Sequence, residues 1–375
     1  MSEQIIENLI IGAGPAGLAV AGRMSKQNLP FVMVEQAENV VSSWRGHYDR
    51  LCLHTVRQLS HLPHLPIPAS YPTYLPRLSL IEYFESYVST FKIEPLLNKT
   101  VKKVVKERPY WRVEINADEI IYAKNVIVAS GVNRVPSVPK WEGKDNYEGL
   151  LIHSRTYKNP DPFKGKNTLV IGMGNTGAEI ALDLAEQGVD CALSVRSEIN
   201  VVPRDLNGRP TQLTAKSLEK FPFGLGDWLG TQIRKFYYGD LSKYGLRTSK
   251  LSPVVQLKKT GKTPVIDLGT IQKIKEGKIK VFGDVQSFTT NGLNFKKEGS
   301  VNFDAVILAT GYKAKVEDFI PGIESFLDQY RVPKQVIGED KFKGLYFVGF
   351  DNYKLGGIIG TIHTDSGIAV DDING

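Results

Sequence analysis

The sequence has few cysteines, and none of them forms a reactive pair. Cys52 and Cys191 are the only two among 375 residues, and neither belongs to a C-x-x-C motif. This absence argues against a dithiol reductase and against a thiolate metal centre, so no metal site is predicted. We expect both thiols to be reduced and buried, as in a cytoplasmic protein.

Long apolar segments are also missing. The most apolar stretch, residues 9–22, is interrupted by glycines and a proline at a density that a membrane-spanning helix does not tolerate. The polar N-terminus leads directly into a glycine-rich turn, without room for a signal peptide. The net charge is +7, but the lysines between residues 250 and 280 alternate with apolar and glycine positions, which favours a solvated surface over a nucleic-acid site. We therefore expect a cytoplasmic protein with no membrane and no nucleic-acid partner.

Four short apolar runs each end in a glycine-containing turn, as buried parallel strands do. They cover residues 8–11, 126–129, 168–171 and 306–309. The runs 8–11 and 168–171 are each followed by a helix and a second strand, so the β-α-β pattern occurs twice. A proline-rich loop at 62–76, a helix at 80–91 and an irregular region at 201–224 are expected between these elements. The chain length allows two domains, and we predict an α/β fold with two Rossmann-like dinucleotide-binding domains.

The first glycine-rich turn has the pattern G-x-G-x-x-G between a strand and a helix. The backbone amides of such a turn face a pyrophosphate at the helix N-terminus. An acidic residue follows eighteen positions after the last glycine, at the end of the next strand. A carboxylate there accepts hydrogen bonds from ribose hydroxyls and repels a 2'-phosphate, which indicates FAD or NAD(H). The residues assigned to this site are Gly12, Gly14, Pro15, Ala16, Gly17 and Glu35.

The second glycine-rich turn repeats the pattern, but its second strand ends in a cation. Arg196 stands where the first copy has an acid, and a guanidinium can pair bidentately with an adenosine 2'-phosphate. This exchange of charge favours NADPH over NADH, with Ser194 and Ser197 as further donors. The residues assigned to the site are Gly172, Gly174, Asn175, Thr176, Gly177, Arg196 and Ser197.

Two dinucleotide sites in one chain indicate hydride transfer from a nicotinamide to a second redox group. Flavin is the group that commonly occupies such a site, so FAD and NADPH are the predicted cofactors. Without a dithiol, a metal cluster or a haem motif, the electrons can pass to oxygen, to a quinone or to a soluble carrier. The residues alone leave these three acceptors open.

Further motifs make the chain resemble the class B flavin-containing monooxygenases, and within them the YUCCA-type enzymes. Tyr147, Gly149, His153 and Tyr157 have the spacing of the family marker F-x-G-x-x-x-H-x-x-x-Y/F. Baeyer-Villiger relatives carry Trp at the last position, so that subfamily is disfavoured. A packing role for His153 is as well founded as a chemical one.

The resemblance extends to segments outside the two turns. Ser43, Trp44 and Arg45 stand where relatives place a loop against the flavin, and Thr310 and Gly311 are assigned to FAD on the same ground. The block from Tyr48 to Pro68 is similar to YUCCA enzymes, with His54 where many monooxygenases have an Asn near the flavin. The resemblance thus implies that His54 and Asn175 are the catalytic residues, which hydrogen-bond the oxygen adduct or the bound NADP+.

The resemblance also implies the reaction. NADPH reduces FAD, oxygen gives a C4a-(hydro)peroxyflavin, and a 2-oxo acid such as indole-3-pyruvate is oxidatively decarboxylated. N- or S-oxygenation of a small amine or thioether is one alternative, and NADPH oxidase or flavin reductase activity without substrate oxygenation is another. The implied partners are molecular oxygen and a small-molecule substrate. A homodimer is possible. Arg50, Arg57 or Arg204 could bind a substrate carboxylate, and residues 351–354 depart from the YUCCA pattern.

The expected domain organisation follows from the two copies. Residues 1–145 and 310–375 form the FAD-binding domain, and residues 146–309 form an inserted NADPH-binding domain. The turns at Ser130-Gly131 and Thr310-Gly311 then serve as a hinge pair. The aromatic-rich segment 221–238 is assigned to packing in preference to a substrate surface.

Overall fold

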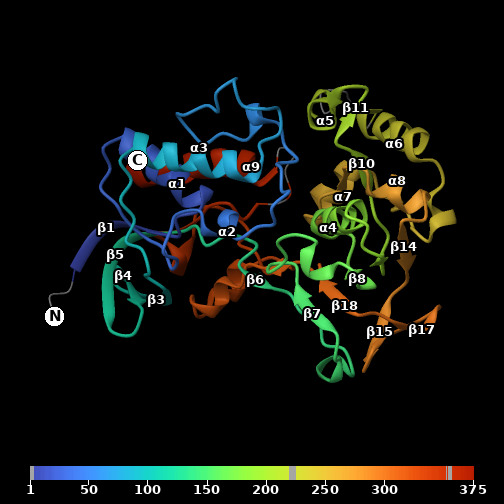
Figure 1. The fold of residues 1–375 in the computed structure, drawn as a ribbon. Coiled ribbons are helices and arrows are strands. Elements are labelled where there is room, and N and C mark those ends of the chain that lie inside the picture. Colours follow the sequence, from blue (N-terminus) through green and yellow to red (C-terminus); the bar gives the residue numbers. More distant parts are fainter. Residues whose placement is uncertain (1–3, 219–224, 352, 354–356) are drawn as a thin grey trace. The chain divides into compact units, whose positions relative to one another are not determined.

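The computed structural model describes residues 4–218, 225–351, 353 and 357–375, and it divides into two compact units (Figure 1). Unit 1 comprises Met1–Gly46, Thr55–Val135 and Tyr312–Gly375, and unit 2 comprises His47–His54 and Pro136–Gly311. The segment His47–His54 therefore belongs with unit 2, although the sequence pattern placed it in the first domain.

Unit 1 is built on a six-stranded sheet with the order β2-β1-β5-β4-β3, and β20 pairs with the end of β5. β2, β1, β5 and β20 are parallel, whereas β4 and β3 are antiparallel to their neighbours. The helices α1, α3 and α9 lie together beside this sheet (Figure 1). The elements are β1 (Gln4–Ile11), α1 (Pro15–Lys26), β2 (Val32–Val34), α2 (Ser42–Arg45), α3 (Arg77–Thr90), β3 (Val101–Glu107), β4 (Tyr110–Ile115), β5 (Glu119–Val128), β20 (Leu345–Phe347) and α9 (Gly357–Asn374).

Unit 2 is built on a five-stranded sheet in which all strands are parallel, with the order β14-β9-β8-β18-β7. The helix α4 packs on β8 and β9, with α8 beside it, and an antiparallel meander β15-β16-β17 follows β14. The elements are β7 (Leu150–His153), β8 (Thr168–Ile171), α4 (Asn175–Glu186), β9 (Cys191–Ser194), α8 (Thr270–Lys275), β14 (Ile279–Phe282), β15 (Val285–Thr289), β16 (Gly292–Phe295), β17 (Gly299–Asn302) and β18 (Ala305–Leu308).

The predicted α/β fold with two Rossmann-like domains is confirmed, because each unit has a set of parallel strands and a glycine-rich turn between a strand and the following helix, β1–α1 in unit 1 and β8–α4 in unit 2. The four apolar runs lie at the ends of β1 and β5, in β8 and at the end of β18, and all their residues are buried except Ala309, which is half-buried. Cys191 is buried as expected, whereas Cys52 is half-buried, and both are free thiols.

The region predicted to be irregular between residues 201 and 224 is partly regular. Pro210 precedes a helix that begins at Thr211, and a proline fits this position because the first amides of a helix have no intrahelical partner. Residues 219–224, including the aromatics Phe221 and Phe223, lie outside the described part, as do Asn352 and Lys354. The elements are β10 (Val201–Pro203), β11 (Asp205–Leu206), β12 (Arg209–Pro210), α5 (Thr211–Leu218), α6 (Leu225–Tyr238), α7 (Pro253–Thr260) and β13 (Val265–Asp267).

None of the helices in the described ranges is both long enough and apolar enough to span a lipid bilayer.

Candidate functional site

The first glycine-rich turn brings β1 and α1 into close contact. Gly12 has φ +106°, and a Cβ there would lie 2.7 Å from the Ala129 carbonyl oxygen. A Cβ on Gly17 would lie 1.9 Å from the Gly12 carbonyl oxygen, so only glycine permits this packing. Gly14 differs, because a Cβ there would have no neighbour within 4 Å. The turn is therefore tight on its protein side and open at the start of α1.

Glu35 lies at the end of β2, beside this turn. Its carboxylate is 6% exposed and accepts hydrogen bonds from the backbone N–H groups of Ala13, at 2.7 Å, and Ala37, at 2.9 Å. Each carboxylate oxygen keeps a further lone pair, which a ribose hydroxyl can use. Glu35, which is predicted to bind the ribose, thus also orders the turn. The sequence pattern did not indicate this second role.

The loop that follows β2 returns to the same turn. The Val41 N–H donates to the Ala13 carbonyl at 3.0 Å, and α2 begins at the next residue. Within α2, Trp44 packs against Phe84 and the Arg45 guanidinium pairs with Glu85 at 2.5 Å. Ser43 is exposed. The loop is thus anchored at both ends within unit 1, and its Arg45 has a protein partner.

The end of β5 adds a polar group and open space to unit 1. The Ser130 hydroxyl is buried and has no hydrogen-bond partner among the residues that the structure describes. Gly131 has φ +80°, and a Cβ there would have no neighbour within 4 Å. A buried donor without a partner is rare in proteins and indicates a ligand or water at this place.

The second glycine-rich turn has nearly the same backbone conformation as the first. Gly172 has φ +108°, and a Cβ there would lie 2.5 Å from the Ala309 carbonyl oxygen. A Cβ on Gly177 would lie 1.9 Å from the Gly172 carbonyl oxygen, whereas one on Gly174 would be free of contacts. The caps Gly14 (φ −81°, ψ −177°) and Gly174 (φ −86°, ψ −174°) are nearly superimposable in conformation. Both turns therefore offer the same backbone cradle.

Thr310 and Gly311 follow β18 and lie in unit 2, beside the second turn. The Thr310 hydroxyl donates to the Ser137 carbonyl at 2.5 Å, and Ser137 N–H donates to the Gly311 carbonyl at 2.9 Å. The sequence pattern assigned both residues to FAD. Their position in unit 2 makes them neighbours of the predicted NADPH cradle.

The cation predicted to select NADPH has a neighbour that the sequence did not reveal. Arg196 is exposed just beyond β9, and the Arg247 guanidinium donates to its backbone carbonyl. Neither arginine forms an ion pair in the described part of the chain. Ser197 is exposed, but Ser194 is buried and donates to the Gly283 carbonyl at 2.7 Å. Two guanidinium groups, and not Ser194, are thus available to an anion at this strand end.

Asn175 is the first residue of α4 and is held on both sides of its amide. Its Oδ1 accepts from the Ile266 N–H at 2.6 Å, and its Nδ2 donates to Thr263 Oγ1 and the Pro264 carbonyl, each at 3.3 Å. These bonds tie the segment before β13 to the start of α4. Thr176 is half-buried in the first turn of that helix.

The segment His47–His54 is fastened to two buried carboxylates on α4. The Tyr48 hydroxyl donates to Glu179 Oε2 at 2.7 Å, and His54 Nε2 lies 3.2 Å from the same oxygen. Glu179 is only 3% exposed. Because a carboxylate oxygen accepts hydrogen bonds, this contact places a proton on His54 Nε2.

The second buried carboxylate, Asp183, binds Arg50 at 3.2 Å and accepts the Tyr157 hydroxyl at 2.7 Å. Burial raises the pKa of Tyr157, so this hydroxyl stays protonated and donates. Burial alone would lower the pKa of Arg50, but Glu186 and Asp183 outweigh it. Of the three proposed carboxylate-binding arginines, Arg50 is thus already paired, Arg204 pairs with Asp205, and Arg57 donates to the Tyr71 carbonyl.

The family marker residues have structural roles within unit 2. The Tyr147 hydroxyl donates to the Phe303 carbonyl at 2.8 Å, and a Cβ on Gly149 would lie 2.2 Å from that hydroxyl. His153 accepts from the Arg155 N–H through Nδ1, so Nε2 donates to the Gly311 carbonyl at 3.2 Å. Burial lowers the pKa of His153, which favours this neutral form. The spacing of the marker is therefore set by packing and backbone contacts.

The chain is similar to known proteins along almost its whole length. Residues 8–362 match the family described as FMO-like, flavin-binding monooxygenase-like. The chain is 34% identical over 369 residues to indole-3-pyruvate monooxygenase YUCCA1 of Oryza sativa subsp. japonica, with 97% of this chain and 90% of that protein covered. It is 36% identical over 363 residues to probable indole-3-pyruvate monooxygenase YUCCA8 of Arabidopsis thaliana, with 93% and 85% covered.

Solved structures share the fold at lower identity. A flavin-containing monooxygenase from Stenotrophomonas maltophilia has a TM-score of 0.76 at 18% identity, with 99% of this chain and 98% of that chain covered. A structure described as OTEMO in complex with FAD and NADP has a TM-score of 0.74 at 15% identity, with 100% and 86% covered. At these identities the likeness establishes the fold alone.

Proposed function

The chain belongs to the flavin-binding monooxygenase-like family, and we propose that it oxidatively decarboxylates a 2-oxo acid, with indole-3-pyruvate as the first substrate to test. It is an FAD-containing, NADPH-dependent monooxygenase, so molecular oxygen is the co-substrate. The observation that carries the choice of substrate is the similarity over more than nine-tenths of the chain to plant enzymes named for indole-3-pyruvate.

The residues present fit one cofactor in each unit. In unit 1 the open space at Gly14, the lone pairs of Glu35 and the unpartnered Ser130 hydroxyl suit the pyrophosphate, ribose and polar edge of FAD. In unit 2 the open space at Gly174 and the cations Arg196 and Arg247 suit NADPH. When bound, the flavin supplies the redox chemistry that activates oxygen, and the chain's residues bind, orient and exclude water.

We assign different roles to the two residues proposed to be catalytic. His54 presents an imidazole whose tautomer Glu179 sets, which suits a group that holds a proton at a defined atom. Asn175 instead orders residues 263–266 at the start of α4 through its own amide. Its contribution is to position that segment, because both ends of the amide already have protein partners.

The substrate proposal predicts that indole-3-pyruvate and NADPH are consumed in equal amounts with release of one equivalent of CO2. Phenylpyruvate tests whether the indole ring is required. A tertiary amine and a thioether form the comparison set, each scored by mass spectrometry for an added oxygen atom. Oxygen transfer to the amine or thioether without CO2 release would replace the 2-oxo acid as the substrate class. NADPH consumption that ends entirely as hydrogen peroxide with every compound would instead identify an oxidase.

His54→Ala is expected to raise the share of NADPH that ends as hydrogen peroxide by about tenfold, since removing one preorganised donor commonly costs tenfold or more. The measurement is peroxide formed per NADPH oxidised in the presence of substrate. Tyr48→Phe is the matched control, because it removes the other hydrogen bond to Glu179 Oε2 and leaves the imidazole in place. Equal peroxide yields from the two variants would show that His54 acts only by fastening its segment to α4.

A further inference from the structure

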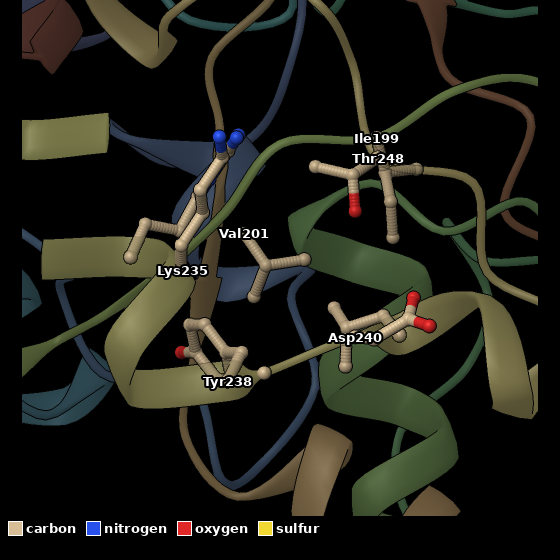
Figure 2. A pocket seen from close by; sticks show the side chains of 9 residues that line it. Ile199, Val201, Lys235, Tyr238, Asp240 and Thr248 are labelled. Carbon is tan, nitrogen blue, oxygen red and sulfur yellow. The ribbon is translucent and has the colours of Figure 1, made fainter. Parts of the chain in front are cut away.

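Unit 2 contains a pocket of about 420 Å³ that neither glycine-rich turn lines. It lies between β10, the C-terminal end of α6 and the residues that follow α6. Ile199, Val201, Tyr238 and Leu241 contribute apolar wall, and Thr248 lies beside Ile199 at the edge (Figure 2). The pocket has the size and apolar lining of a site for a small organic molecule.

A buried cation lines this pocket and has no counterion among the residues that the structure describes. Arg234 is 6% exposed, and its Nη1 donates to Asn200 Oδ1. No carboxylate pairs with Arg234 within the ranges that the structure describes. Burial lowers the pKa of Arg234, which expresses the cost of holding this charge away from water. A buried charge is ordinarily paired, so a guanidinium with one neutral acceptor is prepared for an anion.

Asn200 cannot relieve this charge further, because its amide is fixed. Its Nδ2 donates to the Leu251 carbonyl and to Gln256 Oε1, each at 3.0 Å, and the residue is 1% exposed. The oxygen of the amide must therefore face Arg234. The arrangement holds the guanidinium in position at the pocket wall.

Two further charged side chains line the pocket, and both are exposed. Lys235 is a second cation. The Asp240 carboxylate accepts from the Ser242 N–H at 2.9 Å, which caps the following 3₁₀ turn (Leu241–Tyr244). Hydrogen bonds from the Ser242 side chain and backbone lower the pKa of Asp240. Asp240 is thus an anion engaged with the backbone. The charged lining comprises two cations and one anion, so an anionic ligand is favoured.

We propose that this pocket binds a small carboxylic acid with a flat apolar body, whose carboxylate pairs with Arg234. Ile199, Val201 and Tyr238 supply the apolar contacts. A carboxylate matches the bidentate geometry of a guanidinium, and the apolar walls favour an aromatic or aliphatic acid over inorganic phosphate. The lining residues differ from those assigned to the cofactors, although Ile199 N–H donates to the Arg247 carbonyl, and the proposal does not depend on the proposed reaction.

The test is calorimetric titration of the purified holoenzyme with phenylacetate, indole-3-acetate and inorganic phosphate, without turnover and with saturating NADP+ present. Saturable binding of the aromatic acids, with phosphate weaker, is expected. Arg234→Gln keeps a donor for Asn200 and removes the charge, so it should weaken binding of the aromatic acids by about tenfold or more. Lys235→Gln, at an exposed position, should change the affinity by no more than about twofold.

A second variant guards against misfolding of the first. Thr248→Trp places a bulky ring at the exposed edge of the pocket and should abolish binding without touching the buried charge. Absence of saturable binding, tighter binding of phosphate, or equal affinity of wild type, Arg234→Gln and Thr248→Trp would overturn the proposal. NADPH oxidation with 2-oxo acids is measured separately, so failure of the reaction and failure of this site are distinguishable.

Discussion

Gly14→Ala should fold like the wild type and be purified without FAD. Gly14 has φ −81° and ψ −177°, an extended conformation open to any residue, and a Cβ there meets nothing within 4 Å. The substitution therefore costs the folded chain little. Its methyl group would, however, occupy the open space at the N-terminus of α1, where a pyrophosphate must approach the backbone amides closely. We expect a flavin content below about a tenth of the wild-type value. The FAD-free variant should have the same melting temperature as the FAD-free wild type.

Gly174→Ala is the matched variant in unit 2. Its cap has nearly the same conformation, so the same reasoning predicts normal FAD content and a KM for NADPH raised by about tenfold or more. Gly17→Ala is the contrasting case, because its Cβ would lie 1.9 Å from the Gly12 carbonyl and the variant should be unstable. Full flavin occupancy in Gly14→Ala, or loss of FAD in Gly174→Ala, would show that the cofactors are not placed as proposed.

Arg196→Ala is expected to abolish the preference for NADPH over NADH. Arg196 is exposed beyond β9 with no ion pair in the described residues, and Arg247 reaches its carbonyl. A charge-assisted hydrogen bond contributes about 1.5–3 kcal/mol, so kcat/KM for NADPH should fall by about tenfold to a hundredfold. NADH lacks the 2'-phosphate, and its kcat/KM should stay within about twofold of the wild type.

The double variant Arg196→Ala/Arg247→Ala tests the neighbour that only the structure revealed. If both guanidinium groups bind the 2'-phosphate, kcat/KM for NADPH should fall further in the double variant than in Arg196→Ala. The KM for NADPH should also depend less on salt, because salt screens exposed charges and two of these charges have been removed. Lys243→Gln controls for general loss of positive charge, since Lys243 is exposed in the neighbouring 3₁₀ turn. An unchanged ratio of kcat/KM for the two nucleotides in Arg196→Ala would contradict the assignment.

The two β-α-β units could be predicted because their signals are local. Gly12 and Gly17 lie five residues apart, and their spacing already contains the reason for the turn, which is the close approach of helix and strand. The strand at 168–171 was predicted to the residue, since a short apolar run bounded by turns leaves little choice. The regular elements between 201 and 218 were missed because proline and glycine there mark strand ends and a helix start rather than a loop.

The site beyond the turns depends on partners that are distant in sequence. His54 meets Glu179 at a separation of 125 residues, and Arg247 meets Arg196 at a separation of 51. No periodicity records such pairs, because they form only when the chain between them has folded. Asn175 shows the same limit, since the fingerprint placed it correctly at the helix start but gave no sign of its bonds to residues 263–266.

The α/β class, the two glycine-rich turns and their opposite strand-end charges at Glu35 and Arg196 follow from the sequence alone, because backbone sterics and a period of a few residues encode each of them. Only the folded chain shows that residues 47–54 pack on α4 through Glu179 and Asp183, and that Arg234 lines a pocket with no counterion in the described part of the chain. Burial of a charge, and the partner that stabilises it, are properties of the folded chain.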